Sequence, residues 1–290
     1  ELYKRLGHFK EVESIFDSFI PSPIHWHYRN KMEYTFSPVT QAKGDRTYID
    51  DFSLGFKHRG QWLSVENLDK DSGLFDAEVE NTLSQVREYC QQTGLQPWHP
   101  KRHTGFFRNL VVRRSLSTNA LLVNLITTSH GLDNFDIEAF GDFIQKLWNG
   151  RIEGFQHTLN DHTGDRNSRD ADLLVKQVIG KETIEEQLLG LTFEMSIESF
   201  FQPNPKAAEL LYQKAIDYVF EGDIPEGSLI LDLFCGTGTI GQLIAHQNKE
   251  KYGKSVEIIG VDIVEEAIDN AAANAEKNNI EGLRFHAADV

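Results

Sequence analysis

The feature that most constrains this chain is the alternation of apolar strands and helices toward its C-terminus. Strands are predicted over Ser228–Phe234, Val256–Val261 and Leu283–His286, and helices from about Thr239 and over Glu265–Asn278. Strands that alternate with helices of this length form parallel α/β sheets. The C-terminal part is therefore predicted to be an α/β domain.

The residues before this alternation have a different pattern, with short alternating strands and fewer helices. Predicted strands cover Met32–Ser37, Leu54–Lys57 with Trp62–Val65, Leu110–Arg114, Leu121–Thr128, Leu173–Ile179 and Leu188–Met195. Predicted helices cover Glu11–Phe19, Leu74–Gln92, Phe135–Trp148 and Pro205–Val219, the last with an apolar face of Ala208, Leu211, Ala215 and Tyr218. We expect an α+β domain over residues 1–200 and the start of the α/β domain over residues 201–290.

The charge is divided unevenly along the chain. The net charge is −15, which argues against nucleic acid because phosphate contacts need Lys and Arg. However, residues 1–115 hold 16 Lys and Arg against 15 Asp and Glu, whereas residues 116–290 hold 13 against 29. This asymmetry indicates two functional faces or two domains.

Several classes of protein are not expected. Cys90 and Cys235 are too few for a disulfide scaffold or an all-cysteine zinc site, and no histidine spacing is typical of a metal site. No apolar run reaches the ~20 residues that cross a bilayer, and no signal peptide opens the chain. We expect a cytoplasmic monomer without metal or membrane partner.

A glycine-rich turn follows the first C-terminal strand. Asp232 lies near the end of this strand, and Gly236, Gly238 and Gly241 allow a tight turn and close approach of a ligand at a helix N-terminus. The glycine spacing formally fits a dinucleotide site. Asp232 and Cys235 favour a methyltransferase turn instead, with a dinucleotide site or an ordinary strand–turn–helix as alternatives.

Acidic residues follow the next two strands. Asp262 ends the second strand, where a carboxylate can accept the hydroxyl groups of a ribose. Asp289 follows the third strand, where it can reach an adenine. Together with the turn, they predict a site for a nucleoside cofactor.

Four segments together resemble the RNA uracil-C5 methyltransferases, from about residue 5 to residue 290. They are Tyr28–Tyr34, Gly105–Arg113, Ser199-Phe200-Phe201-Gln202-Pro203-Asn204 and the turn Asp232-Leu-Phe-Cys-Gly-Thr-Gly238. The resemblance implies a class I S-adenosylmethionine methyltransferase fold, Rossmann-like, preceded by an α+β central domain. It places cofactor contacts on Gln202, Phe234, Gly236, Gly238, Asp262 and Asp289, and on Thr239, where some relatives have Asn.

The resemblance also implies a reaction. A cysteine thiolate attacks C6 of a uridine, the enolate takes the methyl group at C5, and a base removes the C5 proton. The family's Asp-Pro-Pro-Arg loop, nucleophilic cysteine and glutamate base would follow Val290. We therefore assign no catalytic residue here, give Cys235 and Cys90 packing roles, and expect this chain alone to be inactive.

Many bacterial relatives bind an iron–sulfur cluster through four cysteines. The last of these is expected near Asn67, which is not a cysteine. We therefore expect no such cluster.

Basic residues interleave with aromatic residues in the first half. Cations can hold phosphates while aromatic rings stack on bases; the alternative is a solvated sheet face above core aromatics. We predict RNA contacts at Arg29, Lys31, Arg108, Arg113 and Arg114. The predicted substrate is a uridine in structured rRNA or tRNA, with no DNA partner. The alternatives are a methyltransferase for a small molecule or protein and a non-catalytic RNA-binding module.

Overall fold

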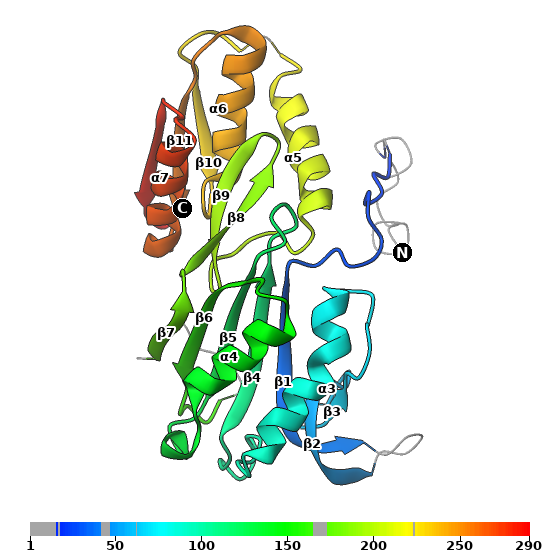
Figure 1. The fold of residues 1–290 in the computed structure, drawn as a ribbon. Coiled ribbons are helices and arrows are strands. Elements are labelled where there is room, and N and C mark those ends of the chain that lie inside the picture. Colours follow the sequence, from blue (N-terminus) through cyan, green and yellow to red (C-terminus); the bar gives the residue numbers. More distant parts are fainter. Residues whose placement is uncertain (1–15, 17, 42–46, 62, 165–172, 223) are drawn as a thin grey trace.

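The computed structural model describes residues 16, 18–41, 47–61, 63–164, 173–222 and 224–290. A seven-stranded sheet with its helices forms one part, a three-stranded sheet with its helices forms the other, and a hairpin lies between them (Figure 1). The predicted helix Glu11–Phe19 falls largely outside the described residues. Among the described residues, no helix is both long and apolar enough to span a bilayer.

The larger sheet is mixed and has the strand order β3-β2-β1-β4-β5-β6-β7. Only β5 and β6 pair in parallel, through a crossover that contains α4. Its elements are β1 (Lys31–Gln41), β2 (Tyr48–Lys57), β3 (Val65–Asn67), α3 (Ala77–Gln92), β4 (Phe107–Arg114), β5 (Leu121–Thr127), a 3₁₀ turn (Leu132–Asn134), α4 (Ile137–Leu147), β6 (Ile152–Leu159) and β7 (Leu174–Gly180).

One face of this sheet packs against α3 and α4. Together they form a first hydrophobic core. The alternation predicted for β1 is confirmed, because Met32, Tyr34 and Phe36 are buried in this core while Glu33 is exposed. The helices begin at Asp76 and Asp136, whose carboxylates accept hydrogen bonds from backbone N–H groups of the first turn.

The other face packs in part against the hairpin of β8 (Thr183–Leu188) and β9 (Leu191–Ser196). The predicted single strand Leu188–Met195 is wrong, because Leu189 and Gly190 adopt positive φ angles of 47° and 90° and form the hairpin turn. The strands β6 and β8 were not predicted. Their sequences, I-E-G-F-Q-H-T-L and T-I-E-E-Q-L, are interrupted by glycine and by paired acids.

The C-terminal part is a parallel sheet with the strand order β10-β11-β12. Its elements are α5 (Pro205–Val219), β10 (Leu229–Leu233), α6 (Thr239–Tyr252), β11 (Glu257–Asp262), α7 (Glu265–Lys277) and β12 (Leu283–Ala287). These bounds lie within two residues of the predicted ones, except that for α6 only the start, near Thr239, was predicted. Asn204 caps α5, its side-chain oxygen accepting a hydrogen bond from the Ala207 N–H at 3.0 Å.

The buried face of α5 differs from the predicted one. Ala208, Tyr212 and Ile216 are buried, whereas Leu211 is 59% exposed and Tyr218 is 53% exposed. The helix is therefore rotated relative to the prediction, and part of its apolar surface faces solvent.

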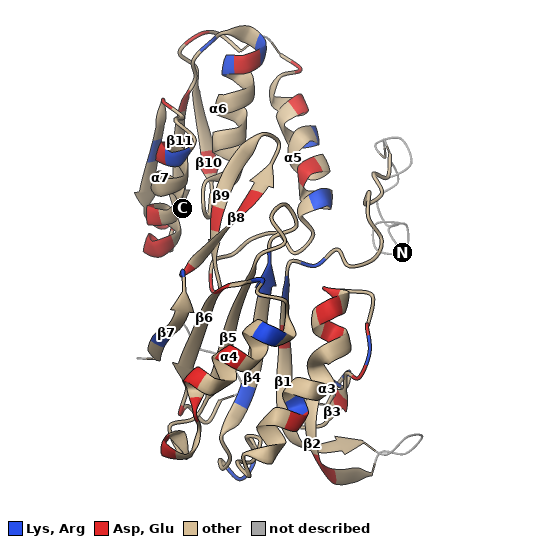
Figure 2. Ribbon diagram, viewed as in Figure 1, with Lys and Arg blue, Asp and Glu red and all other residues tan. Residues whose placement is uncertain are grey.

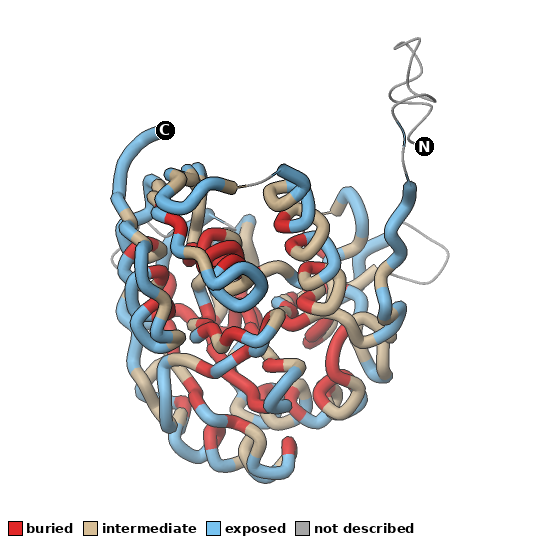
Figure 3. Tube along the Cα trace, turned by 90° about the horizontal axis from the view of Figure 1, so that it is seen from above, coloured by how far each residue is buried: buried red, intermediate tan, exposed pale blue. Residues whose placement is uncertain are grey.

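A second core joins the two parts of the chain. Val111 and Leu122 of the larger sheet pack in the same cluster as Phe193 of the hairpin and Leu243 and Ile258 of the C-terminal part. Seen from above, buried segments run through the interior and exposed segments surround them (Figure 3). The domain boundary near residue 200 stays a proposal, although this core draws on residues from both sides of it.

Candidate cofactor-binding site

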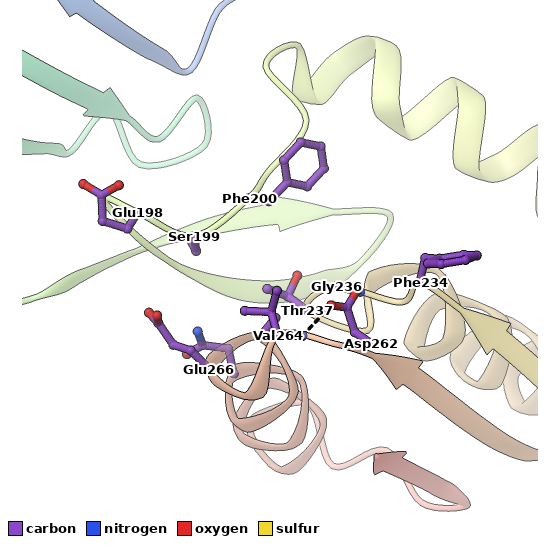
Figure 4. A pocket seen from close by; sticks show the side chains of 11 residues that line it. Glu198, Ser199, Phe200, Phe234, Gly236, Thr237, Asp262, Val264 and Glu266 are labelled. Atoms are coloured by element: carbon purple, nitrogen blue, oxygen red, sulfur yellow. Dashed lines mark hydrogen bonds between the residues drawn. The ribbon is translucent and has the colours of Figure 1, made fainter. Parts of the chain in front are cut away.

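A pocket of about 180 Å³ lies at the carboxyl ends of β10 and β11. One wall is the segment Ile197–Asn204 between β9 and α5, here called the strap. The opposite walls are the turn after β10 and the start of α7 (Figure 4). The lining residues are Glu198, Ser199, Phe200, Phe234, Gly236, Thr237, Asp262, Val264, Glu266, Ala267 and Asn270.

Two carboxylates fix the turn between β10 and α6. Asp262 accepts hydrogen bonds from the Gly236 N–H and the Val264 N–H, each at 2.9 Å. Asp232 accepts one from the Gly241 N–H at 2.9 Å. Burial raises the pKa of Asp232, although the bond from Gly241 opposes that shift. The acids predicted from the strand ends thus hold the backbone that surrounds the pocket.

Exposed aromatic rings and acidic groups border the pocket. Phe200 is 67% exposed and Phe234 is 75% exposed, so both offer ring surface to a ligand. The carboxylates of Glu198, Asp262 and Glu266 also line it (Figure 4). Aromatic surface combined with acidic groups suits a ligand with a planar base, ribose hydroxyls and positive charge.

The structure brings together some of the predicted cofactor contacts. Phe234, Gly236 and Asp262 line the pocket. Gly238, in the turn, and Thr239, the first residue of α6, are not among the lining residues: Gly238 faces the Phe285 ring, and Thr239 is buried.

Two further predicted contacts do not line the pocket. Gln202, on the strap, has its side chain beside Tyr212, where its interaction with the hydroxyl group opposes the rise that burial causes in the pKa of Tyr212. Asp289 is exposed beyond the end of β12.

Sequence reasoning missed the wall that α7 supplies. Glu266, Ala267 and Asn270 lie one to five residues after the helix begins at Glu265 and share one face of it. Their position shortly after Asp262 could have predicted this wall. The first turns of a helix that follows a parallel strand border the crevice at the carboxyl end of that strand.

The cysteines are not activated. Burial, followed by the charges of Asp232 and Asp262, raises the pKa of the Cys235 thiol to about 12. Cys90 is completely buried, and burial raises its pKa as well. Among the described residues, no group of three or more His, Cys, Asp or Glu is arranged to hold a metal ion.

Two of the predicted RNA contacts face the protein interior. Arg108 is 4% exposed; its guanidinium donates to the carbonyl oxygens of Asn160, His162 and Gly164 and lies over the Trp98 ring. Arg113 is 2% exposed and donates to carbonyl oxygens of the strap. The expectation that both meet phosphate is not supported by this arrangement, because β4 is a central strand with structure packed on both faces.

The other three predicted cations lie where the two parts of the chain meet. Lys31 donates to the Ile197 carbonyl, and Arg114 pairs with Asp76 at 3.2 Å on the α3 side of the sheet. Arg29 is partly exposed, with its Nε 3.4 Å from the Lys31 carbonyl oxygen. Figure 2 shows this basic cluster at the end of β4 and the start of β1.

Comparison with known proteins identifies the class of the fold. Residues 224–290 match a family described as a methyltransferase domain. A crystal structure of Pyrococcus abyssi tRNA (uracil-54, C5)-methyltransferase in complex with S-adenosyl-L-homocysteine superposes with a TM-score of 0.67 and 22% identity, covering 98% of this chain and 61% of that one. The fold is therefore that of class I S-adenosylmethionine methyltransferases, as predicted.

Sequence relatives narrow the class further. The chain is 33% identical over 286 residues to a protein of Clostridium tetani and 34% identical over 270 residues to one of Clostridium acetobutylicum, both named as uncharacterized RNA methyltransferases. The matches cover 97% and 93% of this chain but only 58% and 54% of those proteins. The chain is thus a homologue of RNA methyltransferases that spans little more than half their length. S-Adenosylmethionine, the predicted cofactor, is the methyl donor of this fold class.

Proposed function

We propose that this chain belongs to an enzyme that transfers a methyl group from S-adenosylmethionine to C5 of a uridine in structured rRNA or tRNA. The pocket at the ends of β10 and β11 carries the proposal, because it combines Asp262 with exposed Phe200 and Phe234. The names of the relatives support RNA as substrate, and the structural neighbour, a uracil-C5 enzyme, supports the position of methylation.

The residues of the pocket suit the proposed cofactor. A carboxylate has about four lone-pair sites, so Asp262 can accept ribose hydroxyls in addition to the two N–H groups that it already binds. The Phe234 ring can stack on the adenine. Glu198 and Glu266 supply negative potential toward the amino group and the sulfonium. When bound, S-adenosylmethionine supplies an electrophilic methyl group.

Further contacts are proposed by resemblance. Gly236 and Gly238 shape the turn and Thr239 supports it, while Gln202 on the strap and Asp289 after β12 would each have to turn toward the ligand. By the same resemblance, the covalent step, thiolate attack on C6, is assigned to a cysteine outside this chain. Cys235 lies inside the turn, and burial raises the pKa of its thiol.

RNA is proposed to approach the junction of the two parts. The target uridine must leave its stack to reach the sulfonium methyl group, and Arg29 lies at this junction. More distant phosphates are assigned to exposed cations at Lys57, Arg59, Lys101 and Arg102. A strongly acidic protein binds RNA only through such local patches.

The first test is cofactor affinity. Calorimetry should detect S-adenosylhomocysteine binding to the chain and a loss of at least about tenfold in Asp262→Ala, roughly 1.4 kcal/mol. The control is Asp269→Asn, which changes an exposed carboxylate on α7 outside the pocket. Unchanged affinity in Asp262→Ala would remove the site assignment.

The second test is the product. The full-length protein should methylate rRNA or tRNA transcripts, and mass spectrometry of the nucleosides should give 5-methyluridine. Methylation at another base, or of protein instead of RNA, would contradict the proposal.

A further inference from the structure

Three of the four segments that carry the family resemblance meet at the strap. Asn30 and Lys31 come from the Tyr28–Tyr34 segment at the start of β1, and Arg113 comes from the Gly105–Arg113 segment at the end of β4. All three bind backbone carbonyls of the strap. Segments far apart in the sequence therefore converge on one wall of the pocket.

Two cations hold the first half of the strap. Lys31 and Arg113 are direct partners in the register of β1 and β4, so their side chains leave the same face of the sheet side by side. Lys31 Nζ donates to the Ile197 carbonyl oxygen. Arg113 donates to the same oxygen at 3.3 Å and to that of Ser199 at 2.6 Å. Burial lowers the pKa of Arg113 to about 10, while the charge of Glu198 opposes the shift, so the guanidinium stays charged at neutral pH.

An asparagine holds the second half. The Asn30 side chain donates to the Gln202 carbonyl oxygen at 3.0 Å, and its backbone N–H donates to that of Pro203 at 2.9 Å. Asn30 is completely buried, and its own carbonyl accepts a hydrogen bond from the Arg114 N–H. Four carbonyls of the strap are thus held from the larger sheet.

We propose that Arg113, assisted by Lys31 and Asn30, is a positioning residue that holds the strap as the wall of the cofactor pocket. The strap forms neither helix nor strand up to α5, so its carbonyls need partners from outside it. Glu198, Ser199 and Phe200 line the pocket. They lie at or next to Ile197 and Ser199, whose carbonyl oxygens Arg113 binds. Without these hydrogen bonds, ligand binding would have to order the strap. The affinity for the ligand would then fall by the free energy that this ordering costs.

The inference rests on the proposed function, and its test separates the two. Binding of S-adenosylhomocysteine to the 290-residue chain is measured by calorimetry in wild type, Arg113→Met, Arg113→Lys and Arg151→Met. Hydrogen exchange at the amides of Ser199 and Phe200 is measured in each protein. Arg151 serves as the control, because it is also a largely buried arginine in a polar network, yet its guanidinium binds Asp76, Glu78 and Asn119 rather than the strap.

Arg113→Met should weaken binding at least about fivefold and speed exchange at the two amides, because the carbonyl bonds are lost. Arg113→Lys should restore part of the affinity. Arg151→Met should melt at a lower temperature but bind as wild type does. If Arg113→Met does not fold, Lys31→Met, which removes one donor to Ile197, should show the same two effects more weakly.

Wild-type affinity in Arg113→Met, or an equal loss in Arg151→Met, would overturn the positioning role and leave the proposed function intact. Failure of the wild-type chain to bind S-adenosylhomocysteine would overturn both.

Discussion

Gly238 and Gly253 share a backbone conformation but differ in their surroundings. Their φ angles are 67° and 62°, values that L residues rarely adopt. A Cβ atom on Gly238 would lie 2.5 Å from the Phe285 ring, whereas nothing lies within 4 Å of one on Gly253. Gly238 therefore has two reasons to be glycine.

We predict that Gly253→Ala lowers the free energy of unfolding by about 1 kcal/mol, the cost of the left-handed conformation. Gly238→Ala should cost about 1–3 kcal/mol more, because the added methyl group overlaps a packed ring. Chemical denaturation of both variants measures the difference. Equal losses would mean that Phe285 moves aside without cost.

The thiol of Cys235 should be nearly inert at neutral pH. A thiol with a pKa of about 12 is on the order of one part in ten thousand thiolate at pH 8, whereas a free cysteine near 8.5 is about a quarter ionised. Iodoacetamide should therefore modify Cys235 at least about 100-fold more slowly than glutathione in the same solution, as measured by peptide mapping. Modification at the rate of the free thiol would disprove the raised pKa.

At the residue scale, the sequence predicted the site residues whose positions follow from the end of a strand or from a glycine turn. Gly236 and Asp262 follow from the turn and from a strand end, whereas Phe234, which also lines the pocket, was placed by the family resemblance. The interior roles of Arg108 and Arg113 could not be read from the sequence, because the alternation of a strand does not reveal whether its second face is covered. The irregular register between Phe107 and Asn109 disturbs that alternation further.

At the scale of elements, α3 and α4 begin with the same cap but in different surroundings. Asp76 accepts a hydrogen bond from the Val79 N–H and pairs with Arg151 at 2.7 Å and Arg114 at 3.2 Å. Asp136 is exposed and accepts one from the Ala139 N–H. Burial by itself would raise the pKa of Asp76, but the bonds and charges of its partners outweigh burial and lower it.

We predict that Asp76→Asn destabilises the protein at pH 7 by more than Asp136→Asn, whose loss should stay near the ~1 kcal/mol of a cap. A lowered pKa stabilises the fold above the unfolded value, about 3.9, and this contribution is lost as pH falls through the folded value. The excess cost of Asp76→Asn should therefore shrink toward pH 3. Denaturation curves at both pH values measure it, and a pH-independent excess would contradict this account.

Elements with a clear hydrophobic period were predicted well, and those without one were missed. α5, α7, β10 and the start of α6 match within two residues because caps, glycines and periodicity agree. β6 and β8 carry glycine or paired acids where apolar residues would be expected. The buried face of α5 depends on tertiary packing against α6, which the period of the helix alone does not specify.

At the scale of the whole molecule, the described residues cover only one face of β10. Asp232 faces α6, whose Gly241 N–H it binds, whereas Leu229, Leu231 and Leu233 on the opposite face are 54%, 57% and 47% exposed. Parallel sheets are normally buried on both faces. The described part of the chain therefore leaves the leucine face of β10 open to solvent.

We predict that the chain binds the dye anilinonaphthalene sulfonate at this face, because contiguous exposed apolar surface of this kind is uncommon on soluble proteins. Leu231→Gln should reduce the fluorescence clearly, while Leu174→Gln, at a leucine of β7 that is 71% exposed, should leave it nearly unchanged. Equal effects of the two variants would show that the dye does not recognise the leucine face.

The strap belongs to the pocket by position and to the seven-stranded sheet by its hydrogen bonds. Neither half of the molecule can melt without releasing contacts of the other, and the second core adds to that dependence. A ligand that binds only the native state raises its stability with the logarithm of ligand concentration. Heating should therefore give one transition rather than two, and occupancy of the pocket should delay the melting of strands that the ligand never touches.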